Sequence, residues 1–402
     1  MNLIIYNSFN RIFHFLSLAT SYKRWKTTTA IICTFTSILL NNPDYLSFYS
    51  TSSYHWEFSD YRANWKTIYD QSLHPLTPQH HTESTHRSKR AFRLAPALVG
   101  KLLPHTSLDT FIRSLFFLQH ALGFAFFYLF LTLVHQLSGM KAYAMILTLG
   151  LPFIYLGNAF FWDTYGWFDG FALFSLLAAT YSLIMKRLWL VPLFLSLAFW
   201  TDERSIIVSP VILFWIPLIE DKQGQTETYP LWKKVALLYL LTIGLYISIR
   251  LSLGWLFHLS IPVGFSSLVG IKMVLVNMQS MPHSLLNTFD GYWIFPILSL
   301  IWLWNNSSKT YAVCSVVLFT LCWGISYSVL DVTRSLTYAY LWILLAIILV
   351  GKNTEYRVAT AIALLATTIS FISPTLFFLG KSSFSLFNFH QLKVLASQFT
   401  AF

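Results

Sequence analysis

Long apolar runs are the feature that most constrains how this chain folds. Hydrophobic residues make up 55% of the sequence, aromatic residues 18% and charged residues only 11%. A helix needs about 20 apolar residues to cross roughly 30 Å of hydrocarbon, and several runs are long enough. The short segments of alternating polarity that transmembrane β-barrels use are not seen. The sequence therefore predicts an all-α polytopic membrane protein.

The apolar runs predict about eleven transmembrane helices. They lie near 27–43, 110–138, 142–159, 167–185, 188–201, 205–219, 233–257, 291–304, 311–330, 335–350 and 356–379. We divide the chain into an N-terminal cytoplasmic or interfacial segment (1–26), a transmembrane domain (27–379) that includes a long extracytoplasmic loop with amphipathic helices (44–109), and a C-terminal tail (380–402).

Basic residues predict the orientation of these helices. Lys and Arg are favoured in short cytoplasmic loops, so the basic cluster at 23–26 places the N-terminus in the cytoplasm. The later basic loops then alternate as that rule requires, and only Arg204 and Arg334 fall in short outer loops. The net charge of +11 is explained by this bias and by contact with anionic membrane lipids, and no nucleic-acid partner is predicted.

Acidic residues gather on the predicted outer side of the membrane. They come from five separate segments, which contain Asp60, Asp163, Asp169, Asp202, Glu203, Asp290 and Asp331 among others. Outer loops are polar in any case, so the grouping alone fits ordinary solvated loops as well as a site.

The stretch "WTDERSI" is the strongest member of this group. Its flanking runs, 188–201 and 205–219, span only about 21–23 Å as helices, which is short of a full crossing. Asp202, Glu203 and Arg204 are therefore expected below the outer surface. Ionisable groups at such depth pair with one another or line a wet cavity. The alternative is a capped helix start with Arg204 reaching towards the headgroups.

Asp60 stands at the front of a predicted amphipathic helix, "DYRANWKTIYD". Tyr61, Trp65, Ile68 and Tyr69 recur at helical spacing, which predicts a helix lying along the outer membrane face. A carboxylate at its start is placed to act as a general base on a polar acceptor. Helix capping by Asp60 is an equally good interpretation.

Other charged positions predict substrate binding. Arg90 and Arg93 accompany an apolar face in "HRSKRAFRLAPALVGKLLP", which favours docking on headgroups or binding a phosphate. Asp331 and Arg334 are three residues apart, so they form either an internal ion pair or a phosphate site. Asp163 and Asp169 stand among Trp and Tyr residues, as in a sugar-binding wall or an interfacial aromatic belt.

No metal site or cofactor motif is predicted. Four of the 12 histidines, His74, His80, His81 and His86, lie in a Pro-containing stretch without helical metal-ligand spacing. The sequence has no phosphate-binding P-loop, dinucleotide glycine pattern or hydrolase motif.

The layout of a first span, a long outer segment with an early Asp, and later spans ending in "WTDERSI" and "LDVTRS" resembles the GT-C superfold. These integral membrane glycosyltransferases, including bacterial members of unassigned substrate, take sugars from polyprenyl-phosphate carriers. The resemblance covers most of the chain in architecture, although paired acids in the first outer segment are missing.

The resemblance implies sugar transfer from a polyprenyl-phosphate lipid donor to a glycan or lipid acceptor on the extracytoplasmic face. Asp60 matches the family's acidic residue by position and is the expected base, with Asp202 or Glu203 second. Arg204, Arg334, Arg93 and Arg90 are the expected phosphate partners. No cofactor is implied, and a divalent metal is not required.

Other functions remain open from the sequence. The nearest alternative is an outer-leaflet glycan polymerase or ligase that acts on lipid-diphosphate glycans. A secondary transporter would place its charges near the bilayer midplane, whereas here they gather at one end. A non-catalytic membrane subunit docking partners through 44–109 is the third alternative. The expected location is a bacterial inner (cytoplasmic) membrane.

Overall fold

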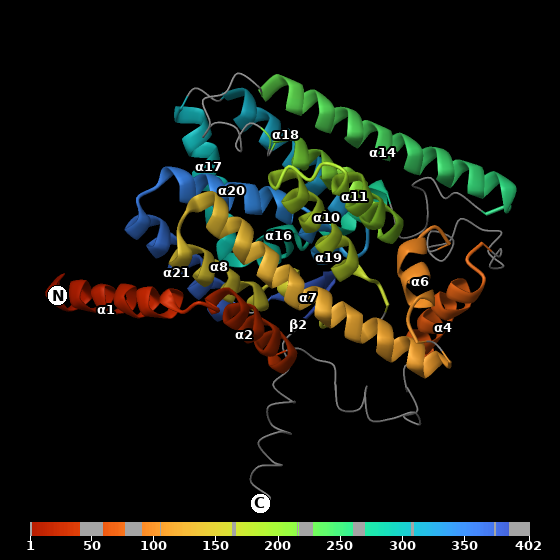
Figure 1. Ribbon diagram of the computed structural model, residues 1–402, viewed down its shortest axis with the longest axis horizontal. Helices are drawn as coiled ribbons and strands as arrows, with labels where there is room; N and C mark the ends of the chain where they lie inside the picture. The colour runs from red at the N-terminus through yellow and green to blue at the C-terminus, as the bar shows by residue number, and fades with distance from the viewer. Residues whose placement is uncertain are drawn as a thin grey trace, which may run out of the picture.

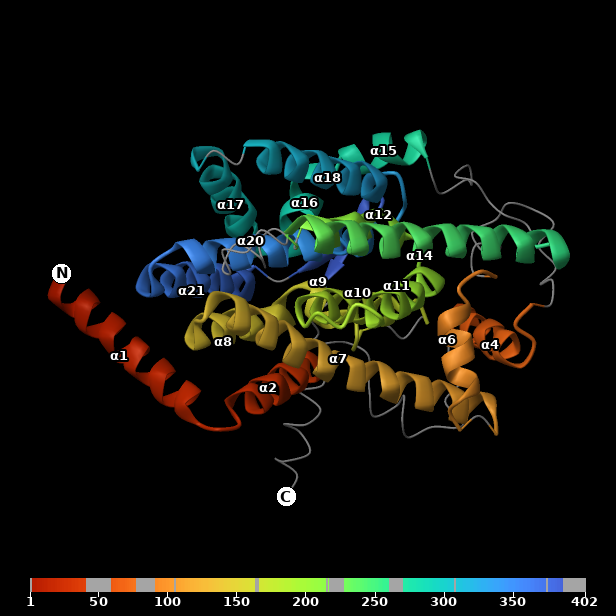
Figure 2. The same cartoon turned by 45° about the horizontal axis from the view of Figure 1, so that its top comes forward.

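A computed structural model describes residues 2–40, 59–76, 91–104, 106–162, 166–214, 216, 228–259, 270–306, 309–373 and 375–385. Within these ranges the chain is almost entirely helical, with one short β-hairpin (Figure 1). The arrangement is a packed group of helices crossed on one side by a long helix, with the N-terminal helix projecting from the opposite side (Figures 1 and 2).

Three helices are long and apolar enough to cross a membrane. They are α7 (Leu108–Ser138), the Leu231–Leu256 part of α14 (Thr228–Leu256), and α18 (Lys309–Tyr327). Several shorter apolar helices accompany them: α8 (Lys141–Gly150), α10 (Asp169–Ile184), α11 (Leu190–Thr201), α20 (Tyr340–Asn353) and α21 (Tyr356–Ile372). The prediction of an apolar helical protein is confirmed, whereas the count of eleven spans remains a prediction.

Local sequence explains the limits of α7. Ser107 caps its start by accepting a hydrogen bond from the backbone N–H of Thr110, at 3.2 Å. Gly139 ends the helix in the left-handed conformation, with φ of 76°, which a residue without Cβ adopts most easily. The predicted span at 110–138 therefore agrees closely with the observed helix.

The core lies where α7, α10, α11 and α20 pack together. Almost every residue of α10 and α20 is buried, including polar ones such as Thr180, which donates to the carbonyl of Leu176. α1 (Asn2–Ser21) and α2 (Trp25–Leu40) lie at one side, and α2 packs against α7 and α8. α14 leaves most of its apolar residues exposed, as expected for a helix in lipid.

Three predicted spans are not single helices. The run at 142–159 divides into α8, η1 (Leu151–Phe153) and α9 (Tyr155–Asn158), because Pro152 lacks a backbone N–H. Asn158 stabilises this break by donating to the carbonyls of Pro152 and Ile154. The run at 205–219 divides into α12 (Arg204–Val208) and η2 (Ser209–Phe214), and the run at 335–350 is preceded by the separate helix α19 (Val332–Thr337).

The end of the last predicted span is a β-hairpin. α21 stops at Ile372, and β1 (Leu376–Leu379) pairs antiparallel with β2 (Ser382–Ser385) around Gly380, whose φ is 59°. The expectation of a helix to 379 is therefore wrong, and the boundary placed at 379 divides the hairpin. The hairpin also qualifies the all-α prediction. Phe378 donates its backbone N–H to Thr333, which fixes β1 against α19.

Several helices were not in the predicted map. Between 259 and 309 the chain forms α15 (Ile271–Met278), α16 (Met281–Phe289), η3 (Asp290–Trp293) and α17 (Ile294–Asn305). Only α17 corresponds to a predicted span, because α15 and α16 are too short and too polar to form a membrane-length run.

The predicted amphipathic helix is present as α4 (Ser59–Leu73), which packs against α6 (Leu94–Lys101). Its aromatic face points into the protein rather than to lipid headgroups. Trp65 is fully buried, with its ring 5.4 Å from that of Phe168 in an edge-to-face contact. This packing places α4 beside the start of α10.

Candidate functional site

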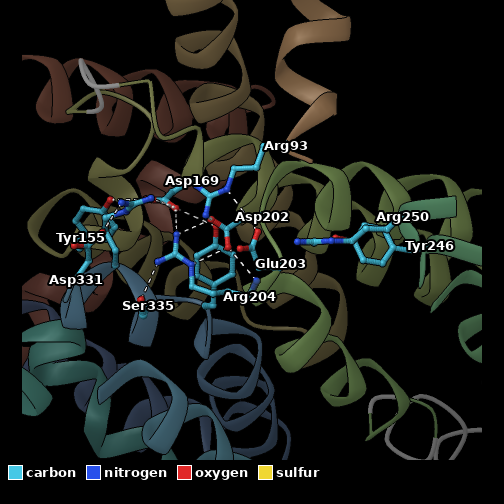
Figure 3. Close-up of polar contacts among 12 residues, drawn as sticks. Arg93, Tyr155, Asp169, Asp202, Glu203, Arg204, Tyr246, Arg250, Asp331 and Ser335 are labelled. Atoms are coloured by element: carbon cyan, nitrogen blue, oxygen red, sulfur yellow. Dashed lines mark hydrogen bonds and ion pairs between the residues drawn. The ribbon is translucent and has the colours of Figure 1, made fainter. Parts of the chain in front are cut away.

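Asp169 is the centre of a buried polar cluster formed by several distant segments (Figure 3). It stands in the first turn of α10 and is fully buried. Its Oδ1 accepts hydrogen bonds from Arg204 at 2.9 Å and Arg334 at 3.1 Å. Its Oδ2 accepts from Nε of Arg334, and the hydroxyl groups of Tyr338 and Tyr155 donate to the two oxygens, each at 3.0 Å. Every contact stabilises the ionised carboxylate.

The stretch after α11 supplies a second buried carboxylate. Asp202 is fully buried and accepts three hydrogen bonds from Arg204: from the backbone N–H at 3.0 Å, from Nε at 2.8 Å and from Nη2 at 2.7 Å. Arg204 also donates to Ser335 at 2.8 Å. Because Arg204 contacts Asp169 as well, it joins the ends of α10, α11 and α19.

Arg334 closes the other side of the cluster. It is 3% exposed and donates to Asp331 at 2.7 Å in addition to its bonds with Asp169. Its guanidinium lies 4.0 Å from the ring centroid of Trp167, close enough for a cation–π interaction. The side-chain donors Nε, Nη1 and Nη2 of Arg334 all have partners within the protein.

Arg93 forms the edge of the cluster and is less fully bonded. Its Nη2 lies 3.1 Å from Asp202, and its Nε lies 3.6 Å from Glu203, which is too long for a hydrogen bond. Among the described residues, this buried Nε has no hydrogen-bond partner. Glu203 is the most exposed carboxylate of the cluster, with 30% of its side chain accessible. Asp169 therefore has all its oxygens hydrogen-bonded, whereas Arg93 and Glu203 are incompletely bonded. We call Arg93 and Glu203 the open edge of the cluster.

A small cavity lies beside Arg93. Its volume is about 20 Å³, enough for one water molecule. α4, α6, the segment just before α10 and the end of α11 contribute to its wall: Thr67, Ile68, Gln71, Arg93, Pro96, Gly166, Trp167, Phe168 and Thr201. The amphipathic helix that begins beside Asp60 therefore meets the open edge of the cluster.

Neighbouring charges determine the protonation of the cluster. Burial alone would raise the pKa of Asp202, but the guanidinium groups of Arg204 and Arg93 hold it well below its usual range. Burial would lower the pKa of Arg93, and the carboxylates of Asp202 and Glu203 instead raise it. Asp202 is consequently ionised at neutral pH and accepts protons poorly.

The structure brings together seven of the ten predicted site residues. They are Arg93, Asp169, Asp202, Glu203, Arg204, Asp331 and Arg334. Arg90 and Asp163 lie outside the described residues. Asp60 falls in the first turn of α4, and its side chain is likewise outside the described part.

Three cluster residues were missed by the sequence analysis. Tyr155 and Tyr338 have nothing in their local sequence that distinguishes them from ordinary core tyrosines. Ser335 directly follows Arg334 in the "LDVTRS" stretch, but it was not singled out. Asp290 was noted only as an outer acid. It accepts hydrogen bonds from Thr375 at 3.2 Å and Ser373 at 3.5 Å, and burial raises its pKa to about 8 although these bonds oppose the shift.

Among the described residues, no group of three His, Cys, Asp or Glu side chains is arranged to hold a metal ion. His80, His81 and His86 lie outside that part of the chain. Comparison with known proteins found no match to this chain among protein-family models, curated proteins or solved structures.

Proposed function

We propose that this chain is a multi-pass membrane glycosyltransferase of the GT-C type. It transfers a sugar from a polyprenyl-phosphate carrier to a glycan or lipid acceptor on the extracytoplasmic face of a bacterial cytoplasmic membrane. Anionic lipids contact its basic flanks. The donor substrate is a lipid-phosphate-linked sugar, and no cofactor takes part.

One observation carries this proposal: the open edge of the ionic cluster faces the helix that begins beside Asp60. Thr67 and Gln71 of α4 line the same cavity as Arg93 and Thr201. A cation with an unused donor and the helix of the predicted base therefore meet in one place.

The reaction requires one cation and one base. The anomeric carbon–oxygen bond of the donor breaks, and its electron pair leaves with the lipid phosphate. The acceptor oxygen forms the new bond to the same carbon, and its proton passes to a carboxylate. Arg93 stabilises the departing phosphate with its positive charge, and its Nε–H has no hydrogen-bond partner among the described residues. Asp60 takes the proton.

The cluster geometry ranks the remaining candidates. Both oxygens of Asp202 accept from arginines, so this residue is a poor base and a good positioner of Arg204 and Arg93. Glu203 is partly exposed and weakly paired, so it is the better second choice for the base. The guanidinium groups of Arg204 and Arg334 donate hydrogen bonds to carboxylates of the cluster. These two residues therefore contribute positive electrostatic potential at the site and form no direct bond to the substrate.

The test is release of polyprenyl phosphate from a panel of lipid-linked sugars by reconstituted protein. We expect the wild type to release it from at least one donor and Asp60→Asn to reduce that release by about 10²-fold or more. Asp70→Asn, in the same helix, is the matched control and should keep wild-type activity.

Two results would contradict the proposal. Asp60→Asn with wild-type activity would move the base elsewhere, with Glu203→Gln as the next variant. If no donor releases polyprenyl phosphate, the transferase is rejected. Polymerisation of lipid-diphosphate glycans, solute transport by proteoliposomes and co-purification of a partner enzyme would then be assayed in turn.

A further inference from the structure

α17 and α18 lie at the edge of the helix group (Figures 1 and 2), and an open apolar groove runs between them. Its volume is about 570 Å³, whereas small-molecule sites range from about 300 to about 1,000 Å³. Ala312 lines the groove and also packs with Leu303 and Leu349, so the floor of the groove rests on α20. The lining residues are Leu300, Ile301, Trp304, Asn305, Ala312, Val313, Val316 and Val317.

The apolar surface of the groove continues along both helices. Ile297 on α17 and Leu321 on α18 lie beyond the cavity, and they are 58% and 55% exposed. α18 is one of the three helices that are long and apolar enough to cross a membrane. An exposed apolar strip of this kind on a membrane helix is a contact surface for hydrocarbon.

One end of the groove carries a positive charge. Lys309 is the first residue of α18, and its Nζ lies 5.6 Å from the ring centroid of Trp304, which lines the groove. Lys309 is exposed, and among the described residues no carboxylate lies within ion-pairing distance of it. Tryptophan and lysine are typical of the boundary between hydrocarbon and water, where the ammonium group meets lipid headgroups.

The size of the groove decides between a lipid chain and a protein helix as its occupant. A helix is about 10–12 Å wide with its side chains, so a single turn of about 5.4 Å fills about 400–600 Å³. The groove therefore has the volume of about one helical turn, which is too little to seat a partner helix along its length. A hydrocarbon chain is thinner, and it lies in such a groove lengthwise.

We propose that this groove binds a hydrocarbon chain of an anionic phospholipid and that Lys309 binds the phosphate of the same lipid. The apolar lining accepts the chain, and the ammonium group at the mouth favours a negatively charged headgroup. The 19 residues of α18 place Lys309 about 27 Å from Tyr327, the end that precedes α19 and Arg334. The lipid is therefore distinct from the sugar donor, and this inference does not depend on sugar transfer.

Lipid binding is measured by native mass spectrometry on the full-length protein in a neutral detergent. The probes are phosphatidylglycerol and phosphatidylcholine with identical chains, and we expect the wild type to prefer phosphatidylglycerol about tenfold or more. Lys309→Gln should lower that preference about tenfold, the loss expected for one charged hydrogen-bonding group. Val316→Phe fills the groove from a half-exposed position, so it should weaken the binding of both lipids about tenfold or more.

Two variants on α14 are the matched controls. Lys234→Gln removes an exposed lysine near the start of another membrane-crossing helix. Leu241→Phe enlarges an exposed apolar side chain that does not line the groove. Both variants should bind the two lipids as the wild type does, because only a specific site makes the position of the change matter.

Three results would overturn the proposal. If Lys309→Gln had no more effect than Lys234→Gln, the headgroup contact would be diffuse attraction and not a site. If Val316→Phe bound both lipids as well as Leu241→Phe does, the chain would lie elsewhere. If the wild type were a dimer that Val316→Phe dissociates, a second copy of the chain would cover the groove in place of a lipid.

Discussion

The centre and the edge of the ionic cluster differ in how completely their charges are satisfied. At the centre, Asp169 is fully buried and accepts five hydrogen bonds from two arginines and two tyrosines. At the edge, the buried Nε–H of Arg93 has no hydrogen-bond partner in the described part of the chain, and Glu203 is partly exposed. Both regions contain the same residue types, so composition does not separate them.

This difference suggests how to separate structural from functional charges in an apolar protein. A charged group whose hydrogen bonds are all made within the protein stabilises the fold, whereas one with an unbonded donor or an exposed oxygen is available to a substrate. Breaking a buried ion pair leaves an uncompensated charge and costs about 3–5 kcal/mol, whereas exposed pairs contribute about 0–1 kcal/mol. Substitutions at the centre should therefore reduce stability first. Substitutions at the edge should reduce binding or activity in a protein that remains folded.

The largest expected effect is that of Asp169→Asn. It leaves Arg204 and Arg334 buried without their shared partner, so the free energy of unfolding should fall by about 3–5 kcal/mol. Thermal unfolding in detergent, followed by tryptophan fluorescence, measures the change.

Two milder variants keep this prediction testable if Asp169→Asn does not fold. Tyr338→Phe removes one hydrogen bond to Asp169 and should cost about 1 kcal/mol. Asp70→Asn breaks the exposed pair with Lys66 and should cost less than about 0.5 kcal/mol. If Asp169→Asn were no more harmful than Asp70→Asn, the centre would not be structural.

A double-mutant cycle between Asp169→Asn and Arg334→Gln tests whether the centre acts as one unit. Because the two side chains share a buried hydrogen-bonded contact, the combined loss should be smaller than the sum of the single losses by about 0.5–3 kcal/mol. The same measurement with Asp169→Asn and Lys66→Gln should be additive. If the losses of stability were additive in both pairs, Asp169 and Arg334 would stabilise the fold independently, and the centre would not act as one unit.

Asp290 sharpens the comparison, because it is partly buried and has no arginine partner among the described residues. Burial raises its pKa from 3.8 to about 8, so between these values the folded state binds more protons than the unfolded state. Stability from this group is present at low pH and is lost as pH rises towards 8. Unfolding temperatures measured from pH 5 to pH 9 should show this slope in the wild type, and Asp290→Asn should flatten it. An unchanged slope in the variant would contradict the assignment.

Continuous apolar helices could be predicted from the sequence, whereas breaks in apolar runs could not. Residues 108–138 combine an apolar run with a Ser cap and a Gly stop, and the prediction there was close. The runs at 142–159 and 356–379 are also apolar, yet Pro152 breaks the first, and the second is helical only to Ile372 and ends in the first strand of the hairpin. In both runs the hydropathy correctly indicates an apolar segment, but it does not indicate where the backbone breaks or turns.

Local parts of the site could also be predicted. The Asp202–Arg204 stretch and the Asp331–Arg334 pair are visible as isolated charges between apolar runs. The bond from Arg334 to Asp169 joins residues 165 positions apart, and only the packed fold brings them together.

The most direct test of the account compares Arg93→Gln with Arg334→Gln, measuring polyprenyl phosphate release per folded molecule. We expect Arg93→Gln to remain folded, because Asp202 keeps its three hydrogen bonds from Arg204. It should lose about 10²-fold in release, as removal of a bond to a departing oxyanion does elsewhere. Arg334→Gln should instead lose most of its folded protein. Wild-type release by folded Arg93→Gln would contradict the account, because the open edge would then have no part in the reaction.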